Sequence, residues 1–285
     1  MAIKIENQKS VLFSIVVYKE NFWETETFKN LVSSYQKSND SSVLHIFVYD
    51  NTPGDISQID HFKPSAEEIS VEYFHNPENP GISKAYNDIG NYAQKQEFQA
   101  LVFLDQDTRL PENTYDSYTN YCEKNKGFCV AIPKIKINGN ILSPAKYVNY
   151  RSAQLDEIKE GKISTKNISW INSGMMVETV FFLKSGGYNP KIQLDFSDHF
   201  FVEKLKNMGL DAVNILPLVL EQNLSVYTNS KAQDIARYAL FLRDLKGYRE
   251  GKNKIAIFLR VDLPRLISLS KKHRSTEFLK IRLSN

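Results

Sequence analysis

The residues Ala100-Leu101-Val102-Phe103-Leu104-Asp105-Gln106-Asp107-Thr108 join a continuous apolar run to two closely spaced carboxylates. An apolar run without alternation is typical of a parallel strand that is covered on both faces. In an extended chain, Asp105 and Asp107 point to the same side. Such a pair suits a divalent cation that substrate phosphates also hold. The alternative is an ordinary turn after a strand, because short motifs often arise by chance.

The sequence before this run alternates between strand-like and helix-like segments. Strands are expected at 11–18, 43–50 and 71–75, and helices at 21–38 and 82–96. Strand-like runs that alternate with helical spacing predict an α/β fold with a mostly parallel sheet. In such sheets, ligands bind beyond the carboxyl ends of the strands. Polar residues at those ends are therefore the candidate site residues.

After residue 128 the pattern becomes mixed. Short strands are expected at 128–132, 168–171 and 212–216, and Asn138-Gly139 predicts a hairpin turn. The helices expected here, and then to the C-terminus, are 178–185, 196–208 (closed by Gly209), 232–248 and 254–261. A third C-terminal helix is expected to start at Asp262 as its N-cap, with Pro264 in the first turn.

Composition excludes several classes of protein. The chain has 285 residues, of which 42% are hydrophobic and 24% charged, so a substantial core is expected and disorder is excluded. Cys122 and Cys129 are too few for a disulfide framework, which favours a reducing compartment; a bridge between them is the alternative. No apolar run reaches the roughly 20 residues of a membrane span. Charged residues flank the run 11–18, which argues against a signal peptide and predicts a cytoplasmic protein.

Further motifs lie in a fixed order around the carboxylate pair. Together they resemble the family-two nucleotide-sugar glycosyltransferases, especially their rhamnosyltransferase-like branch. The resemblance covers residues 11–225. The motifs that carry it are Asp50 after the second strand, Asn79-Pro80-Gly81 with Asn87 at the start of a helix, Asp105-Gln106-Asp107, Asn172-Ser173-Gly174, Gly186-Gly187-Tyr188, and Asp195-Phe196-Ser197-Asp198.

The resemblance implies a GT-A fold, in which a Rossmann-like, mixed and mostly parallel sheet is flanked by helices. The GT-A domain would span 1–228, with a donor-binding half at about 10–110 and an acceptor-binding half at about 111–228. A basic helical extension would follow at 229–285. Ser173 and Gly174 would lie on the acceptor side. The donor site would contain Tyr18, Asp50 (against the nucleoside base), Asn79, Gly81, Asn87, Asp105, Gln106 and Asp107.

The resemblance also implies roles in catalysis. Asp105 and Asp107 match the residues that hold Mn²⁺ or Mg²⁺ and the diphosphate. Asp198 matches the catalytic base, six residues before Lys204, where the family has Arg; Asp195 is the alternative base. Such a transfer needs a carboxylate to accept the acceptor's proton and a cation to stabilise the leaving diphosphate. Helix capping is the alternative role for either acid.

Three positions depart from the family pattern. Gln222 stands where many members carry a histidine that can bind the metal, so it is a weak candidate ligand, and Glu221 is its possible substitute. Phe200 replaces the second acid of the base motif. His199 lies beside the expected base, but a lone histidine is more often a packing residue.

These observations predict an inverting, metal-dependent glycosyltransferase of bacterial surface polysaccharide synthesis. The best donor is dTDP-rhamnose, and the acceptor is a glycan or lipid-linked glycan. One alternative is a sugar nucleotidyltransferase-like enzyme. Such enzymes usually have a loop rich in glycine and basic residues after the first strand, but this sequence has Tyr18-Lys19-Glu20-Asn21 there. The other is a non-catalytic nucleotide- or nucleic-acid-binding protein, which the acidic body disfavours.

The last 34 residues, 252–285, carry nine Lys or Arg and two acids, a charge of +7, whereas the rest of the chain carries −4. Apolar residues at helical spacing accompany these basic residues, among them Ile255, Phe258, Leu259 and Ile267. One interpretation is peripheral contact with an anionic membrane, on the inner face of the plasma membrane. The other is an apolar face packed on the body with solvated charges. Because the family often uses lipid-linked acceptors, the resemblance favours the membrane.

Overall fold

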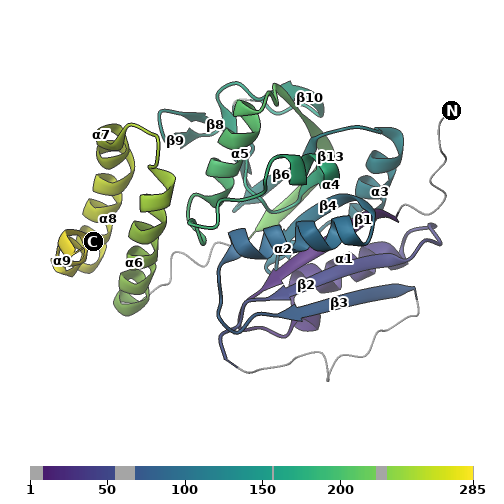
Figure 1. Ribbon diagram of the computed structural model, residues 1–285, viewed down its shortest axis with the longest axis horizontal. Coiled ribbons are helices and arrows are strands. Elements are labelled where there is room, and N and C mark those ends of the chain that lie inside the picture. Colours follow the sequence, from purple (N-terminus) through teal and green to yellow (C-terminus); the bar gives the residue numbers. More distant parts are fainter. Residues whose placement is uncertain (1–8, 55–67, 156, 223–229, 285) are drawn as a thin grey trace.

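The computed structural model describes residues 9–54, 68–155, 157–222 and 230–284 of the chain. Its main sheet has the strand order β10-β13-β6-β12-β4-β1-β2-β3, with β5 paired to β13 and β7 to β6. Helices cover both faces of this sheet, and the C-terminal helices lie together at one side of it (Figure 1). The α/β fold expected from the alternating pattern is confirmed.

The first half of the sheet is parallel. It contains β1 (Lys9–Val17), β2 (Leu44–Asp50), β3 (Ile69–His75) and β4 (Phe98–Asp105). Successive residues of β1 point to opposite faces. Phe13 and Ile15 pack in the core with α1 (Glu26–Gln36), and Leu12 packs in the core with α2 (Ile82–Lys95). A short 3₁₀ turn, η1 (Phe22–Glu24), precedes α1.

The second half of the sheet is mixed. Strand β12 (Met175–Glu178) pairs antiparallel with β4 and with β6 (Val130–Ile137), and β13 (Ala212–Gln222) runs parallel to β6. Three helices pack on this half: α3 (Thr114–Lys124), α4 (Thr179–Lys184) and α5 (Ser197–Asn207). The remaining strands of the main sheet are β5 (Thr108–Arg109), β7 (Asn140–Ser143) and β10 (Gly161–Ser164).

A second, small sheet has the order β11-β8-β9. Its strands are β8 (Ala145–Val148), β9 (Arg151–Ala153) and β11 (Ile168–Ser169). The strand expected at 168–171 is therefore shorter than predicted. By contrast, β13 runs on to Gln222, well beyond the expected end at 216, because the strand accommodates Pro217 at a register shift. The hairpin turn at Asn138-Gly139 is confirmed, with positive φ at both residues.

The C-terminal region is helical, with α6 (Lys231–Tyr248), α7 (Lys254–Ile257), the π-helical turn η4 (Phe258–Asp262), α8 (Leu263–His273) and α9 (Glu277–Ser284). Helix α8 begins where expected, with Asp262 in the N-cap position and Pro264 in the first turn, but Asp262 has helical backbone angles and its side chain makes no capping hydrogen bond. Its buried carboxylate instead accepts hydrogen bonds from Tyr238 Oη and Arg282 Nε. An aspartate with these long-range partners satisfies its oxygens without capping the helix.

Helices α6 to α9 share a core with the segment around α5. Tyr238, Phe241 and Tyr248 of α6 lie in a cluster with the buried Ile192 and the half-buried Phe196 and Phe200. Among the residues that the structure describes, no helix has both the length and the hydropathy to span a bilayer. Cys122 and Cys129 are both free thiols, and burial raises the pKa of Cys122 to about 11.

Candidate functional site

Residues that follow three neighbouring strands meet at the carboxyl edge of the parallel sheet. After β1, the Tyr18 backbone N–H donates to Gln106 Oε1 beyond β4 at 2.6 Å. The Lys19 N–H donates to Thr52 Oγ1 beyond β2 at 2.7 Å. The structure therefore brings Tyr18 and Gln106, both expected in the donor site, into direct contact at the edge where ligands bind in such sheets.

Asp50 ends β2 and is fully buried. One oxygen, Oδ1, accepts the Thr52 N–H at 2.8 Å, and Oδ2 accepts Tyr73 Oη at 2.8 Å. The carboxylate thus fixes the turn after β2, and its contact with a nucleoside base stays a prediction. The sequence did not indicate the next residue, Asn51, as a candidate site residue. Asn51 is 5% exposed, and its Oδ1 has no hydrogen-bond partner among the described residues, which leaves a buried acceptor at this edge.

Gly81 lies where the start of α2 meets the loop before α5. Its φ is +93°, and a Cβ at this position would stand 2.5 Å from the Gln193 carbonyl oxygen. The same oxygen accepts the Ile82 N–H at 2.7 Å. Glycine is therefore required by close approach as well as by conformation. Asn79, two residues earlier, also has positive φ.

Asn87 projects from α2 toward the turn after α4. Its Oδ1 accepts the Tyr188 N–H at 2.7 Å, and its Nδ2 donates to the Tyr188 carbonyl at 3.0 Å. A Cβ at Gly187 would lie 2.1 Å from Asn87 Oδ1. This fit explains Gly187 by packing. Because both ends of the amide are occupied, a donor contact by Asn87 stays a prediction.

Asp105 and Asp107 end β4 and begin the next turn. Asp105 Oδ2 accepts Gln222 Nε2 at 3.0 Å, and Oδ1 accepts Tyr86 Oη at 3.4 Å. Burial, and next the charge of Asp107, raise the pKa of Asp105 to about 6, although the Gln222 hydrogen bond opposes this. Asp107 is more exposed, and its pKa is also raised, by partial loss of water and by other nearby carboxylates. The two acids therefore form an uncompensated negative site.

The oxygen atoms of Asp105 and Asp107 suit a cation that is shared with a substrate. No cluster of three or more His, Cys, Asp or Glu residues suited to a metal occurs within the described parts of the chain. Two carboxylates with water and phosphate oxygens are nevertheless the usual surroundings of Mg²⁺ in nucleotide sites. Of the two further candidates, Gln222 lies against Asp105, whereas Glu221 is 3.8 Å from Arg109 in an exposed ion pair.

Ser173 and Gly174 adjoin the carboxylate pair. Ser173 Oγ is 2.8 Å from Thr108 Oγ1, one residue beyond Asp107. The Gly174 N–H donates to the Phe103 carbonyl at 2.6 Å, and a Cβ there would clash with Pro133 and Leu220 at 2.5 Å. The segment expected on the acceptor side is therefore next to the expected metal ligands, and its glycine is required by packing.

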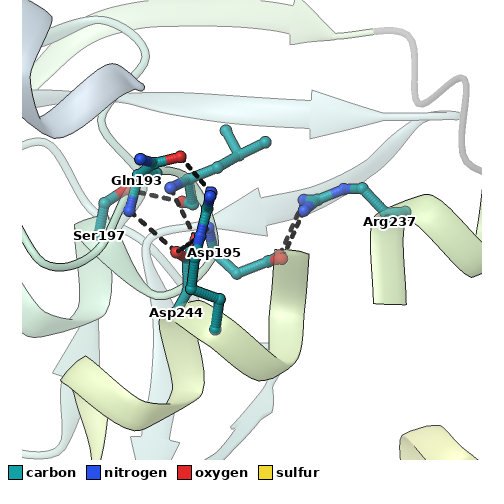
Figure 2. Close-up of polar contacts among 7 residues, drawn as sticks. Gln193, Asp195, Ser197, Arg237 and Asp244 are labelled. Carbon is teal, nitrogen blue, oxygen red and sulfur yellow. Dashed lines mark hydrogen bonds and ion pairs between the residues drawn. The ribbon is translucent and has the colours of Figure 1, made fainter. Parts of the chain in front are cut away.

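Asp198 lies in the first turn of α5 and is partly exposed. Its charge contributes to the raised pKa of Asp105, and to those of the buried Tyr86 and Tyr188, so it lies within electrostatic reach of these three groups. Asp195 faces elsewhere. Its two oxygens accept hydrogen bonds from the two terminal nitrogens of Arg237 on α6 (Figure 2). The charge of Asp198 therefore acts on Asp105, whereas the carboxylate of Asp195 is paired with Arg237.

Two neighbours of the candidate base have packing contacts. His199 stacks on Tyr147 with ring centroids 4.3 Å apart, and its Nδ1 is 2.8 Å from Ser169 Oγ. Lys204, which stands in place of the family's Arg, donates from Nζ to the Gly187 carbonyl at 2.7 Å. Burial lowers the pKa of Lys204. This lysine therefore holds the Gly-Gly turn against α5.

Solved structures share this fold. The crystal structure of GalNAc-T7 with UDP, GalNAc and Mn²⁺ matches with a TM-score of 0.58 and 17% identity, over 90% of this chain and 57% of that one. The structure of S. aureus TarS 1–349 with UDP matches with a TM-score of 0.51 and 16% identity, over 81% of this chain and 64% of that one. The chain thus spans less than two thirds of each of these proteins.

The family of the chain follows from its own sequence. No curated protein matches it. A family model described as "Glycosyl transferase family 2" matches residues 14–180, more than half of the chain. This span includes Asp50, Asp105 and Asp107, and the mixed sheet around them agrees with the GT-A structures above. The chain belongs to glycosyl transferase family 2.

Proposed function

We propose that the protein is an inverting, metal-dependent glycosyltransferase that moves a sugar from a nucleoside diphosphate to a hydroxyl of a glycan or lipid-linked glycan. The observation that carries this proposal is the carboxylate pair Asp105 and Asp107 at the end of β4, with Asp198 in the first turn of α5 near enough for its charge to act on Asp105. A base and a cation-binding pair are the two groups that this reaction needs. The family match supports the reaction class.

In the proposed reaction, Asp198 accepts the proton of the acceptor hydroxyl while the hydroxyl oxygen attacks the anomeric carbon. The bond from that carbon to the diphosphate oxygen breaks, and its electron pair leaves with the diphosphate. Attack from the opposite face inverts the anomeric configuration. Asp105 and Asp107 would hold Mn²⁺ or Mg²⁺, which when bound stabilises the charge on the leaving diphosphate. Ser173 and Gly174 would border the acceptor.

The nucleoside end of the donor would lie beyond β1 and β2. Asn51 Oδ1 is a buried acceptor with no partner in the described structure, and a uracil or thymine ring presents one imide N–H donor. We assign Asn51 to this donor, with Asp50 fixing the turn. The GalNAc-T7 and TarS complexes contain UDP, which supports a pyrimidine nucleotide. The motif resemblance makes dTDP-rhamnose the first donor to test.

The proposed setting is the cytoplasmic side of a bacterial membrane, in surface polysaccharide synthesis. The C-terminal helices expose Ile255 (73%) and Leu259 (52%), four residues apart, in the basic region that begins at Lys252. Apolar side chains among basic ones match the chemistry of an anionic lipid surface. We therefore propose peripheral contact through this face, which would bring the protein to lipid-linked acceptors.

A thermal-shift panel tests the donor proposal. Uridine and thymidine diphosphates and their sugars are each added with Mn²⁺, Mg²⁺ or EDTA. A ligand that binds only the folded state raises the melting temperature. We expect stabilisation by dTDP or UDP compounds that EDTA abolishes. Absence of any shift, or a shift that EDTA does not change, would overturn the metal-dependent donor site.

A further inference from the structure

Asp244 of α6 is a buried carboxylate that holds the chain before α5. It is 0% exposed, and it accepts hydrogen bonds from three successive backbone N–H groups. Its Oδ1 accepts the Gln193 N–H at 3.1 Å, and its Oδ2 accepts those of Leu194 at 2.8 Å and Asp195 at 2.9 Å (Figure 2). Hydrogen bonds to a charged acceptor are about twice as strong as neutral ones. The segment 193–195 is therefore fixed by the C-terminal helices.

A second contact lies two helical turns earlier on α6. Arg237 donates to both oxygens of Asp195, in the fork geometry that gives the most directional ion pairs. Residues seven apart share one face of a helix. Arg237 and Asp244 therefore hold the same segment from one face of α6. Arg237 binds the side chain of Asp195, and Asp244 binds the backbone N–H groups of the segment.

The fixed segment leads directly into the helix that carries the candidate base. Ser197 Oγ donates to the Leu194 carbonyl at 3.0 Å. Between them, Phe196 has the left-handed φ of +67°, and its ring stacks on Tyr248 of α6 at 4.7 Å. A bulky residue keeps this conformation only where its surroundings enforce it. The direction of the first turn of α5, which includes Asp198, is thus set by contacts with α6.

The opposite side of the segment touches the donor half. The Gln193 carbonyl accepts the Ile82 N–H, and only a glycine at position 81 allows that approach. Gln193 therefore bonds to α2 through its C=O and to Asp244 through its N–H. One residue connects the start of the donor-side helix with the C-terminal helices.

We propose that Asp244 is a positioning residue for the base Asp198, so that helix α6 completes the active site. This inference rests on the proposed function. By holding three amides, Asp244 fixes the entry of α5, and thereby the distance between Asp198 and the carboxylate pair. A change to Asn removes the charge and turns one acceptor oxygen into a donor that faces backbone N–H groups.

The test uses Asp244→Asn in the full chain, with three measurements: amide hydrogen exchange, donor binding by calorimetry with Mn²⁺, and transfer kinetics. We expect exchange at Gln193, Leu194 and Asp195 to accelerate about tenfold or more. We expect kcat to fall by about tenfold to a hundredfold, because a misplaced base costs rate, while the donor Kd changes less than about twofold. Amides of α8 and α9 should keep their protection.

Glu250→Gln is the matched control. Glu250 is also a carboxylate of the C-terminal region, 3.0 Å from Lys191, but its side chain is 57% exposed. Its loss should change none of the three measurements. If Asp244→Asn does not fold, Arg237→Gln replaces it, because Arg237 is partly exposed and the three amide bonds to Asp244 remain. The same separation of kcat from donor Kd is expected for this variant.

Two results would overturn the inference: unchanged exchange at the three amides, or faster exchange with unchanged kcat. A purely structural role would lower the stability of the whole protein and leave the kcat of the folded fraction unchanged. Failure of the wild-type chain to bind or transfer any sugar would overturn the proposed function and the catalytic role of Asp244 with it. The exchange rates would still show whether Asp244 holds the segment.

Discussion

The amide of Gln222 donates to Asp105 at 3.0 Å, from the end of β13 to the end of β4. The contact spans 117 residues of sequence and places a neutral side chain where many family members have a histidine. Gln222 satisfies one oxygen of the carboxylate without adding positive charge. In the proposed site, a bound divalent cation would balance the negative charges of the carboxylate pair and of the substrate phosphates.

Replacing Gln222 with His should strengthen cation binding. An imidazole at this position can ligate Mn²⁺, so we expect the cation's affinity, measured by calorimetry with the nucleoside diphosphate, to rise about tenfold. Glu221→His is the control, because Glu221 faces Arg109 instead of Asp105. Equal gains from both substitutions would show that Gln222 does not lie in the metal site.

Asp105→Asn should stabilise the ligand-free protein at neutral pH. The pKa of Asp105 is raised to about 6, so the native state holds this proton more tightly than the unfolded chain. Stability contributed by the protonated form is full at low pH and is lost as pH rises to about 6. In EDTA at pH 8 we expect a gain of up to about 3 kcal/mol in the free energy of unfolding.

Urea denaturation at several pH values measures this gain. It should shrink steadily below pH 6 and vanish near about pH 3, where the wild-type carboxyl is protonated in both states. An Asp105→Asn protein that is less stable than the wild type at pH 8 would show that the charge of Asp105 is compensated within the fold.

Asp198→Asn should abolish transfer and leave donor binding intact. A general base contributes at least about a hundredfold, so kcat should fall by that factor or more while the donor Kd is unchanged. Asp211→Asn is the control, since Asp211 is an exposed aspartate beyond the opposite end of α5. Normal turnover by the Asp198 variant would assign the base elsewhere.

Gly81→Ala tests the close approach between α2 and Gln193. Its Cβ would stand 2.5 Å from the Gln193 oxygen, so we expect a loss of about 2–4 kcal/mol in the free energy of unfolding. Gly54→Ala has a similar φ of +98° but nothing within 4 Å, so it should lose only about 1–2 kcal/mol. Similar losses in chemical denaturation would mean that the approach has no energetic role.

The exposed face of the C-terminal helices should bind anionic vesicles. Replacing Ile255 and Leu259 with Ser removes the apolar part of this face, and we expect vesicle affinity in sedimentation to fall about tenfold. Val180→Ser is the control, because Val180 is 68% exposed but lies on α4. Binding that these changes do not alter, or that neutral vesicles reproduce, would refute the membrane contact.

Most of the fold could be predicted because it depends on local patterns. The apolar runs of β1 and β4 mark buried parallel strands, and Asn138-Gly139 marks a hairpin. The end of β13 could not be predicted, because Pro217 looks like a strand end and only pairing with β6 and β5 carries the strand onward. The start of α8 after Asp262 could be predicted, but not that the Asp262 side chain bonds to Arg282 of another helix instead of capping α8.

The candidate site shows the same division. The sequence marks Asp105 and Asp107 by their position after a strand, and the resemblance to the family marks Asp198. It cannot show that Asp195 pairs with Arg237, or that the amide of Asn87 is used by Tyr188. Each of these contacts joins residues at least 42 positions apart, and no local pattern encodes it.

The shared core of Ile192, Phe196 and Phe200 with Tyr248 has a consequence for protein engineering. A chimaera that exchanges only the last 57 residues between relatives would pair new helices with an old loop, and the aromatic stack and amide contacts would no longer match. Grafts that also carry residues 190–200 would keep both halves of each contact. The unit that can be exchanged in this chain is then set by its packed surfaces, which include residues 190–200.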